Sequence, residues 1–263
     1  PYRRQASDVY KRQELNCEPN GRFAHTPEPI PQNLTGISDL LKTGVADVGF
    51  VVDPDVDRLA IVMENGEMFV EEYTLVAVAD YILQHTPGST VSNLSSSRAL
   101  GDVTRAHGCE YHASAVGEVN VVTKMKDTGA VIGGEGNGGV IYPEAHYGRD
   151  ALVGVALFLT LLAHSGKKVS ELKAGYPPYE IAKNKVELTP DIDVDAILEK
   201  MKERYAGEKI TDIDGVKIDF ADSWVHLRKS NTEPIIRIYA EAATMEKAEA
   251  LAESVKAVMA SMA

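Results

Sequence analysis

The sequence predicts an α/β protein built from the end of one α/β domain, a complete three-layer α/β domain and a C-terminal α+β domain. Three observations support this fold class. Helix-like and strand-like segments alternate from about residue 70 to 165, which is typical of α/β layers. A Tyr-Pro-Pro-Tyr segment at residues 176–179 then has the composition of a linker. Beyond it several strand-like runs follow with only two helical segments, as in a small α+β domain.

The first domain is expected to occupy residues 14–68 and to contain only the end of an α/β unit. Residues 1–13 are basic and show no period, so we treat them as a foreign or disordered arm. An irregular segment and a short helix are expected next, at residues 14–34 and 38–42. Two β-branched runs, at 46–52 and 59–62, predict strands, and Asn65-Gly66 predicts a tight turn after them.

The second domain is expected to span residues 69–174. Apolar positions keep helical spacing over residues 71–84, and the remaining pattern alternates strands with helices. We expect strands at 90–94, 110–113 and 130–133 and helices at 97–107 and 119–126. An apolar run at 151–163 is too short to span a bilayer and predicts a buried helix.

The third domain is expected to span residues 175–263. Thr244 is a good N-cap for the last helix, and Glu246 lies near the positive end of that helix. We expect strands at 183–188, around Gly215 and Trp224, and at 235–241, with helices at 195–205 and 245–262.

Composition excludes several classes of function. The chain has 263 residues, of which 44% are hydrophobic and 25% charged, as in ordinary globular proteins. Its net charge of −12 argues against nucleic-acid binding, which normally needs a basic face. No signal peptide or membrane span is evident, and the two cysteines lack metal or redox spacing. We therefore expect a cytoplasmic protein without nucleic-acid or membrane partners.

An acidic loop is the most informative local feature. Asp53, Asp55 and Asp57 alternate directly after a strand-like run and are followed by Arg58. Three such carboxylates repel one another unless a positive charge lies between them, and oxygen-rich clusters suit a hard cation such as Mg²⁺. A polar turn between two strands is the alternative. An EF-hand is disfavoured, because Arg58 stands where that motif needs glycine and strands flank the loop in place of helices.

A glycine-rich loop and a basic loop are the other candidates for ligand binding. In residues 133–139 only Glu135 and Asn137 have side chains that form hydrogen bonds, and such a pair suits a sugar diol. A flexible glycine turn is the alternative. The second loop gathers guanidinium, hydroxyl and amide groups that suit a phosphate, with a solvated turn as the alternative. Its residues are Arg228, Ser230, Asn231 and Thr232, with Arg237 beyond.

The order of these three loops resembles the α-D-phosphohexomutases, the family of phosphoglucomutase, phosphomannomutase and phosphoglucosamine mutase. The resemblance covers the chain after Glu14 and rests on a D-x-D-x-D-R loop, a G-E-x-x-G loop and an R-x-S-x-T-E-P loop. It implies that Asp53, Asp55 and Asp57 bind Mg²⁺ and that Arg58 lies beside the reacting phosphoryl group. It further implies sugar binding by Glu135 and a grip on the other phosphate by Arg228, Ser230, Asn231 and Thr232.

By this resemblance the parent enzyme moves a phosphoryl group between O1 and O6 of a hexose phosphate through a hexose bisphosphate. The chain corresponds to the tail of domain 2 and to domains 3 and 4 of the family. We find no T-x-S-H-N-P loop, which carries the phosphorylated serine in the family's first domain. We therefore expect the chain alone to be inactive and to need the missing N-terminal domains as its partner.

The sugar and the class of function stay open at this point. Asn137 stands where many members of the family have serine, so glucosamine, glucose and mannose phosphates are all candidates, with phosphoglucosamine mutase favoured. The competing interpretations are a non-catalytic module that binds phosphosugars and a structural protein that binds cations.

Overall fold

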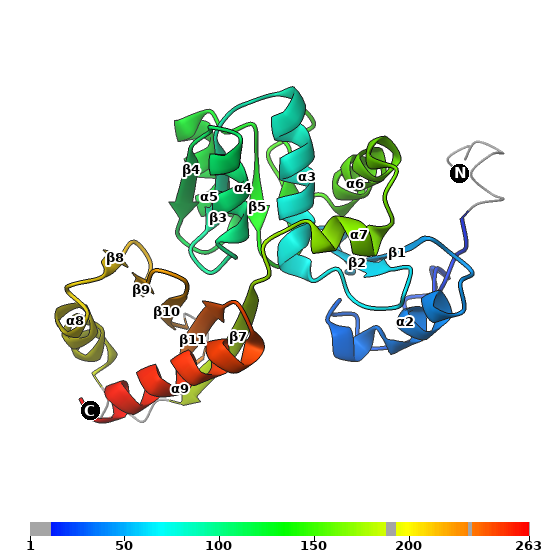
Figure 1. The fold of residues 1–263 in the computed structure, drawn as a ribbon. Helices are drawn as coiled ribbons and strands as arrows, with labels where there is room; N and C mark the ends of the chain where they lie inside the picture. The colour runs from blue at the N-terminus through cyan, green and yellow to red at the C-terminus, as the bar shows by residue number, and fades with distance from the viewer. Residues whose placement is uncertain (1–11, 188–192, 231–232, 263) are drawn as a thin grey trace.

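The computed structural model describes residues 12–187, 193–230 and 233–262 (Figure 1). In the first part, a 3-10 helix η1 (Pro31–Asn33) and helix α2 (Thr35–Lys42) precede an antiparallel ribbon of β1 (Val48–Val52) and β2 (Leu59–Met63). The last residue pair of the ribbon is Val52 with Leu59, so the acidic loop is the connection between the two strands. The prediction of strand, loop and strand is confirmed.

The middle part is a three-layer α/β/α unit. Its sheet has the order β4-β3-β5-β6, with β4, β3 and β5 parallel and β6 antiparallel. Val140 of β6 packs with α3 and α6, whereas Ile141 packs with α5, so helices cover both faces. The elements are α3 (Glu71–His85), β3 (Thr90–Asn93), α4 (Ala99–Ala106), β4 (Tyr111–Ser114), α5 (Glu118–Thr128), β5 (Ile132–Glu135), β6 (Gly139–Ile141), α6 (Ala151–Ser165) and α7 (Val169–Ala174).

The glycine-rich segment forms a tight hairpin rather than a loose loop. Strand β5 begins two residues later than the strand expected at 130–133 and extends to Glu135. Glu135 then pairs with Gly139, the first residue of β6, which the sequence pattern did not predict. The backbone of Gly138 has φ of +91°, a left-handed conformation that favours glycine. The glycines therefore shape a hairpin that holds Glu135 and Asn137 in place.

The prediction of a buried helix at 151–163 is only partly correct. Helix α6 forms there, but only one side of it is buried, by residues that include Phe158 and Leu161. The side chains of Leu152 and Leu159 are 65% and 44% exposed. The helix is thus apolar on its exposed side as well as on its buried side, and its apolar composition alone does not show which side is covered. No helix in the part of the chain that the structure describes has the length and apolar character needed to cross a membrane.

The C-terminal part is a five-stranded antiparallel sheet with two helices. Its strand order is β7-β11-β10-β9-β8, and one apolar core lies between the sheet and both helices. Thr244 caps the last helix by accepting a hydrogen bond from the backbone N–H of Lys247, at 3.3 Å, as predicted. The elements are β7 (Glu180–Glu187), α8 (Val194–Arg204), β8 (Lys209–Thr211), β9 (Val216–Asp219), β10 (Trp224–Lys229), β11 (Ile235–Ala242) and α9 (Met245–Ala260). Leu188, the expected end of β7, lies outside the described residues.

The segment at 176–179 connects the middle and C-terminal parts and is fixed to helices of the middle part. The hydroxyl of Tyr73 donates to the carbonyl of Pro177 at 2.5 Å and accepts from the backbone N–H of Tyr179 at 2.8 Å. The Tyr179 hydroxyl donates to Asp102 in α4 at 2.7 Å. These contacts hold the segment that leads into β7 against α3 and α4.

Candidate functional site

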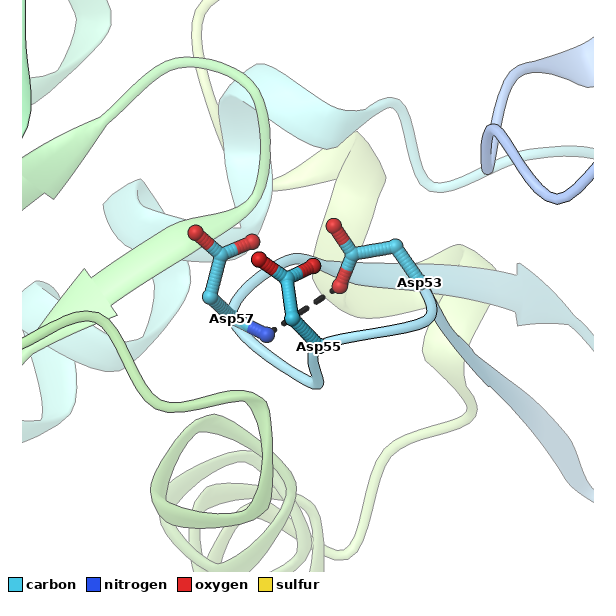
Figure 2. A group of neighbouring side chains, drawn as sticks. All are labelled: Asp53, Asp55 and Asp57. Atoms are coloured by element: carbon cyan, nitrogen blue, oxygen red, sulfur yellow. Dashed lines mark hydrogen bonds between the residues drawn. The ribbon is translucent and has the colours of Figure 1, made fainter.

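The acidic loop brings three carboxylates together on one side of its backbone (Figure 2). One oxygen atom from each of Asp53, Asp55 and Asp57 lies within 4.8 Å of the others, a spacing that suits a single metal ion. Val56 has φ of +61°, which is unfavourable for a β-branched residue. Two backbone hydrogen bonds hold it there, from Val56 to Asp53 at 3.1 Å and from Ala151 to Val56 at 3.0 Å. The loop therefore stores local strain where the acids converge.

Arg58 is turned toward Asp53. The carboxylate of Asp53 accepts hydrogen bonds from the backbone N–H groups of Asp57 and Arg58 at 3.1 and 3.0 Å, and from the Arg58 guanidinium at 2.6 Å. Burial raises the pKa of Asp53, but the hydrogen bonds from Arg58 outweigh it and hold that pKa below its usual range. Asp53 is thus a negative charge at neutral pH, although its side chain is buried.

Asp57 has one oxygen that is available to a cation. Its Oδ2 forms an ion pair with Nη2 of Arg149. Its Oδ1 is buried and has no hydrogen-bond partner among the described residues, although it lies 3.6 Å from Nε of Arg58. Burial, together with the neighbouring Asp53 carboxylate, raises the pKa of Asp57 to about 6. A buried oxygen without a donor, beside two other carboxylates, fits the ligand set that Mg²⁺ prefers.

Glu135 lies at the end of β5 and is only 5% exposed. Its Oε1 accepts hydrogen bonds from the side-chain amide of Asn93 at 2.8 Å and from the backbone N–H of Gly117 at 3.0 Å. Its Oε2 accepts from Nη1 of Arg149 at 2.8 Å. At the hairpin tip, the Oδ1 of Asn137 accepts from the backbone N–H of Gly139 at 3.2 Å. The carboxylate is therefore fixed in orientation before any ligand arrives.

The basic loop places two guanidinium groups on neighbouring strands. Arg228 of β10 is the register partner of Arg237 of β11. The Nε of Arg228 lies 2.9 and 3.0 Å from the two carboxylate oxygens of Asp214, and Arg237 pairs with Glu233 at 3.1 Å. Ser230 is 8% exposed, and its backbone N–H donates to the Ile235 carbonyl at 2.9 Å. The predicted residues Asn231 and Thr232 lie outside the described residues.

The sugar and phosphate candidates meet in one cavity of about 400 Å³ between the middle and C-terminal parts. A cavity of this size suits a small polar ligand. The carboxylates of the acidic loop do not line this cavity, but one of them, Asp57, is joined to Glu135 through Arg149. The lining residues are Glu72, Asn93, Ser95, Val116, Glu135, Gly136, Asn137, Lys183, His226, Arg228, Ser230, Arg237 and Tyr239.

Several residues of this site were not found by sequence reasoning. Glu72 is buried, accepts from the backbone N–H of Ser97 at 3.0 Å and lies 3.9 Å from the ammonium of Lys183. His226 is buried, and its Nδ1 lies 2.9 Å from the Ser95 hydroxyl. Burial lowers the pKa of His226 to about 4, so its ring is neutral. In the sequence neither Glu72 nor His226 stands in a motif, and only the folding of distant segments brings them to this cavity.

The buried carboxyl of Glu72 predicts a pH-dependent stability. Burial raises its pKa from 4.5 to about 8, with Glu71 and Glu241 adding to the rise and Lys183 opposing it. The folded state therefore keeps this proton after the unfolded state has lost it. The contribution of the protonated Glu72 carboxyl to the free energy of unfolding is complete below about pH 4.5, and it is lost as the pH rises through about 8. The stability of Glu72→Gln relative to the wild type should therefore rise by roughly 4 kcal/mol between about pH 5 and pH 9.

Urea unfolding at several pH values would measure this difference. Glu203→Gln is the matched control, because Glu203 is an exposed carboxylate of helix α8 and makes the same change of charge. We expect its stability to follow the wild type across the same range. Parallel stability curves for Glu72→Gln and the wild type would show that the Glu72 carboxyl does not titrate with a raised pKa.

Comparison with protein families finds three consecutive matches along the chain. Residues 6–66 match phosphoglucomutase/phosphomannomutase, alpha/beta/alpha domain II. Residues 71–179 match alpha/beta/alpha domain III of the same group. Residues 183–258 match its C-terminal domain. The matches stand in the same order as the three structural parts.

Individual proteins that are similar in sequence belong to the same group of mutases. The chain is 39% identical over 238 residues to a phosphoglucomutase/phosphomannomutase of Thermococcus kodakarensis, covering 89% of this chain and 52% of that protein. It is 33% identical over 241 residues to a phosphoglucosamine/phosphogalactosamine mutase of Sulfurisphaera tokodaii, covering 90% and 53%. The chain thus spans about half the length of the curated relatives it matches.

Solved structures share the fold. A phosphoglucomutase/phosphomannomutase family protein of Burkholderia thailandensis superposes with a TM-score of 0.79 at 26% identity, over 90% of this chain and 52% of that one. An N-acetylphosphoglucosamine mutase of Aspergillus fumigatus, solved with GlcNAc-6P and magnesium, superposes with a TM-score of 0.55 at 17% identity, over 78% of this chain and 50% of that one. With three family domains matched in order across most of its length, the chain belongs to the α-D-phosphohexomutase family.

Proposed function

We propose that the chain carries the metal, sugar and phosphate sites of a phosphohexomutase. One observation carries this proposal: residues selected from two separate loops, Glu135 and Asn137 from one and Arg228, Ser230 and Arg237 from the other, line a single cavity. The proposed enzyme moves a phosphoryl group between O1 and O6 of a hexose phosphate through a hexose bisphosphate. The proposed domains are those expected from sequence, residues 14–68, 69–174 and 175–263, after an arm at residues 1–13.

In this proposal Asp53, Asp55 and Asp57 hold Mg²⁺, and Arg58 lies beside the reacting phosphoryl group. The ion, when bound, would neutralise charge on that group. The available Oδ1 of Asp57 and the spacing of the three carboxylates support this assignment. Magnesium also accompanies the ligand in the Aspergillus fumigatus structure.

Glu135 and Asn137 would orient the sugar, and the basic loop would hold the phosphate that does not react. Arg228, Ser230 and Arg237 supply charged and hydroxyl donors on one side of the cavity, and we assign Asn231 and Thr232 to the same role. Phosphoryl transfer depends mainly on positioning and on neutralising charge, and a fixed carboxylate opposite a basic clamp provides the positioning.

We propose a hexosamine phosphate as the preferred substrate, with glucose and mannose phosphates next. The carboxylate of Glu135 lies at the cavity and would pair with the ammonium of an amino sugar, and the carboxyl of Glu72 offers a further hydrogen-bond acceptor there. The name of the Sulfurisphaera tokodaii relative agrees with this preference, whereas that of the Thermococcus kodakarensis relative favours glucose or mannose.

We further propose that the 263-residue chain binds hexose phosphates without converting them. It contains no T-x-S-H-N-P loop to carry the phosphoryl group. The alternative of a non-catalytic phosphosugar-binding module makes the same prediction for the isolated chain. An assay with a hexose 1-phosphate, a hexose bisphosphate and Mg²⁺ measures turnover directly, and robust turnover would refute the proposed inactivity.

Calorimetry tests the binding part of the proposal. We expect heat with glucosamine 1-phosphate and glucose 1-phosphate, and weaker binding of inorganic phosphate or free glucosamine, because each of these lacks one half of the ligand. Equal affinities for inorganic phosphate and the sugar phosphates would argue against a sugar site. Tighter binding of glucose 1-phosphate than of glucosamine 1-phosphate would argue against the amino-sugar preference.

A further inference from the structure

Arg149 lies at the centre of the site, among carboxylates from three separate segments. Its Nη1 donates to Glu135 at 2.8 Å, and its Nη2 pairs with Asp57. Its Nε lies 3.5 Å from Glu118, which also accepts the backbone N–H of Arg149 at 2.9 Å. The Arg149 side chain is 17% exposed. One guanidinium thus joins the acidic loop to the hairpin that carries Glu135.

The backbone around Arg149 is shaped to admit it. A Cβ atom at Gly139 would lie 2.4 Å from Cδ of Arg149, so the stem of the arginine occupies the space that a side chain at position 139 would need. Arg149 precedes Asp150, whose carboxylate caps helix α6 by accepting from Leu152 and Val153. The arginine is therefore held by packing and by the helix start as well as by its ion pairs.

Two guanidinium groups share the charge of the acidic loop. Arg58 is paired with Asp53 and, at 3.6 Å, with Asp57, and Arg149 is paired with Asp57. A divalent cation that enters the loop therefore meets a net charge of about −1 from these five side chains, where the three carboxylates alone would supply −3. Charges only a few ångströms away in a partly buried site change ion affinity strongly.

We propose that Arg149 is an internal counter-cation that weakens the binding of Mg²⁺ to the acidic loop. It neutralises Asp57 from the Oδ2 side and leaves Oδ1 without a hydrogen bond among the described residues, with Nε of Arg58 3.6 Å away. The loop then binds the metal firmly only when further negative charge, such as a phosphoryl group, is present. This inference rests on the proposed role of Asp53, Asp55 and Asp57 as metal ligands.

Titration calorimetry with Mg²⁺ alone tests the inference. Arg149→Gln should bind Mg²⁺ about tenfold to a hundredfold more tightly than the wild type, because a positive charge beside the ion is removed. Arg149→Lys keeps the charge and should remain within a few-fold of the wild type. Arg105→Gln is matched to Arg149→Gln in net charge, and Arg105 is exposed and pairs with Asp102 instead. It should leave the affinity unchanged.

Two outcomes separate this inference from the proposed metal site. If Asp55→Asn binds Mg²⁺ as the wild type does, the heat does not come from the loop and the metal assignment fails. If Asp55→Asn loses binding but Arg149→Gln gains none, the metal site stands and the counter-cation role is wrong. Undetectable binding in both the wild type and Arg149→Gln counts as no gain and also overturns the counter-cation role of Arg149.

Arg149→Gln could lose its fold, because Glu135 would then keep a buried carboxylate without its cation. Circular dichroism and thermal melting identify that case. The double variant Glu135→Gln/Arg149→Gln removes the unpaired charge and serves as the second test. Because Asp57 is released from its ion pair in both variants, the same gain in Mg²⁺ affinity is expected relative to Glu135→Gln.

Discussion

Gly138→Ala should lower the free energy of unfolding by about 3–5 kcal/mol, a large loss for one methyl group. Two costs add at this position. The backbone φ of +91° is one that side chains disfavour, and an added Cβ would lie 2.4 Å from the carbonyl oxygen of Leu59. That neighbour is backbone at the start of a fully buried strand, and its N–H donates to the Gly138 carbonyl at 3.0 Å. Neither partner has room to move.

Urea unfolding of Gly138→Ala would measure the loss, and Gly36→Ala is the control. Gly36 lies in helix α2 with no atom within 4 Å of an added Cβ, so alanine there should be neutral or slightly stabilising. Because Leu59 directly follows the acidic loop, we also expect Gly138→Ala to weaken Mg²⁺ binding. A loss below about 1 kcal/mol would mean that the hairpin tip shifts away from β2 at little cost.

Local patterns predicted most of the secondary structure and the three candidate loops. The β-branched runs on either side of Asp53–Arg58 form the expected strands, because alternation and branching act over a few neighbours. Thr244 caps its helix for the same reason. The loop near Arg228 was selected for its chemistry alone, and the part of it that the structure describes lies at the cavity. These features need no knowledge of distant segments.

The features that were missed depend on distant contacts. Arg149 has no motif around it, and its role depends on residues 14, 31 and 92 positions away in the sequence, Glu135, Glu118 and Asp57. Composition left a ligand-binding loop and a flexible glycine turn open at residues 133–139, whereas pairing of Glu135 with Gly139 and contact with Leu59 fix the segment as a hairpin. Helix α6 was expected to be buried because composition reports how apolar a segment is and does not report what covers each face.

Arg228→Ala should weaken the binding of glucosamine 1-phosphate by about a hundredfold or more, the largest effect that we expect on ligand binding. Arg228 is oriented by both oxygens of Asp214, which also accepts from the backbone N–H of Val116 at 2.9 Å. The guanidinium is thus fixed at the cavity before the ligand arrives, and little conformational entropy is lost when a phosphate binds. Calorimetry on the wild type and the variant would measure the change.

The two control variants separate charge from geometry. Arg228→Lys keeps the positive charge but loses the two-pronged donor, so we expect an intermediate loss of about tenfold. Arg204→Ala removes an exposed arginine from helix α8 of the same domain and should leave binding unchanged. Equal affinities for Arg228→Ala and Arg204→Ala would show that the basic loop does not hold the phosphate. The sugar phosphate would then have to bind through the hairpin of Glu135 alone, and inorganic phosphate would be expected not to compete with it.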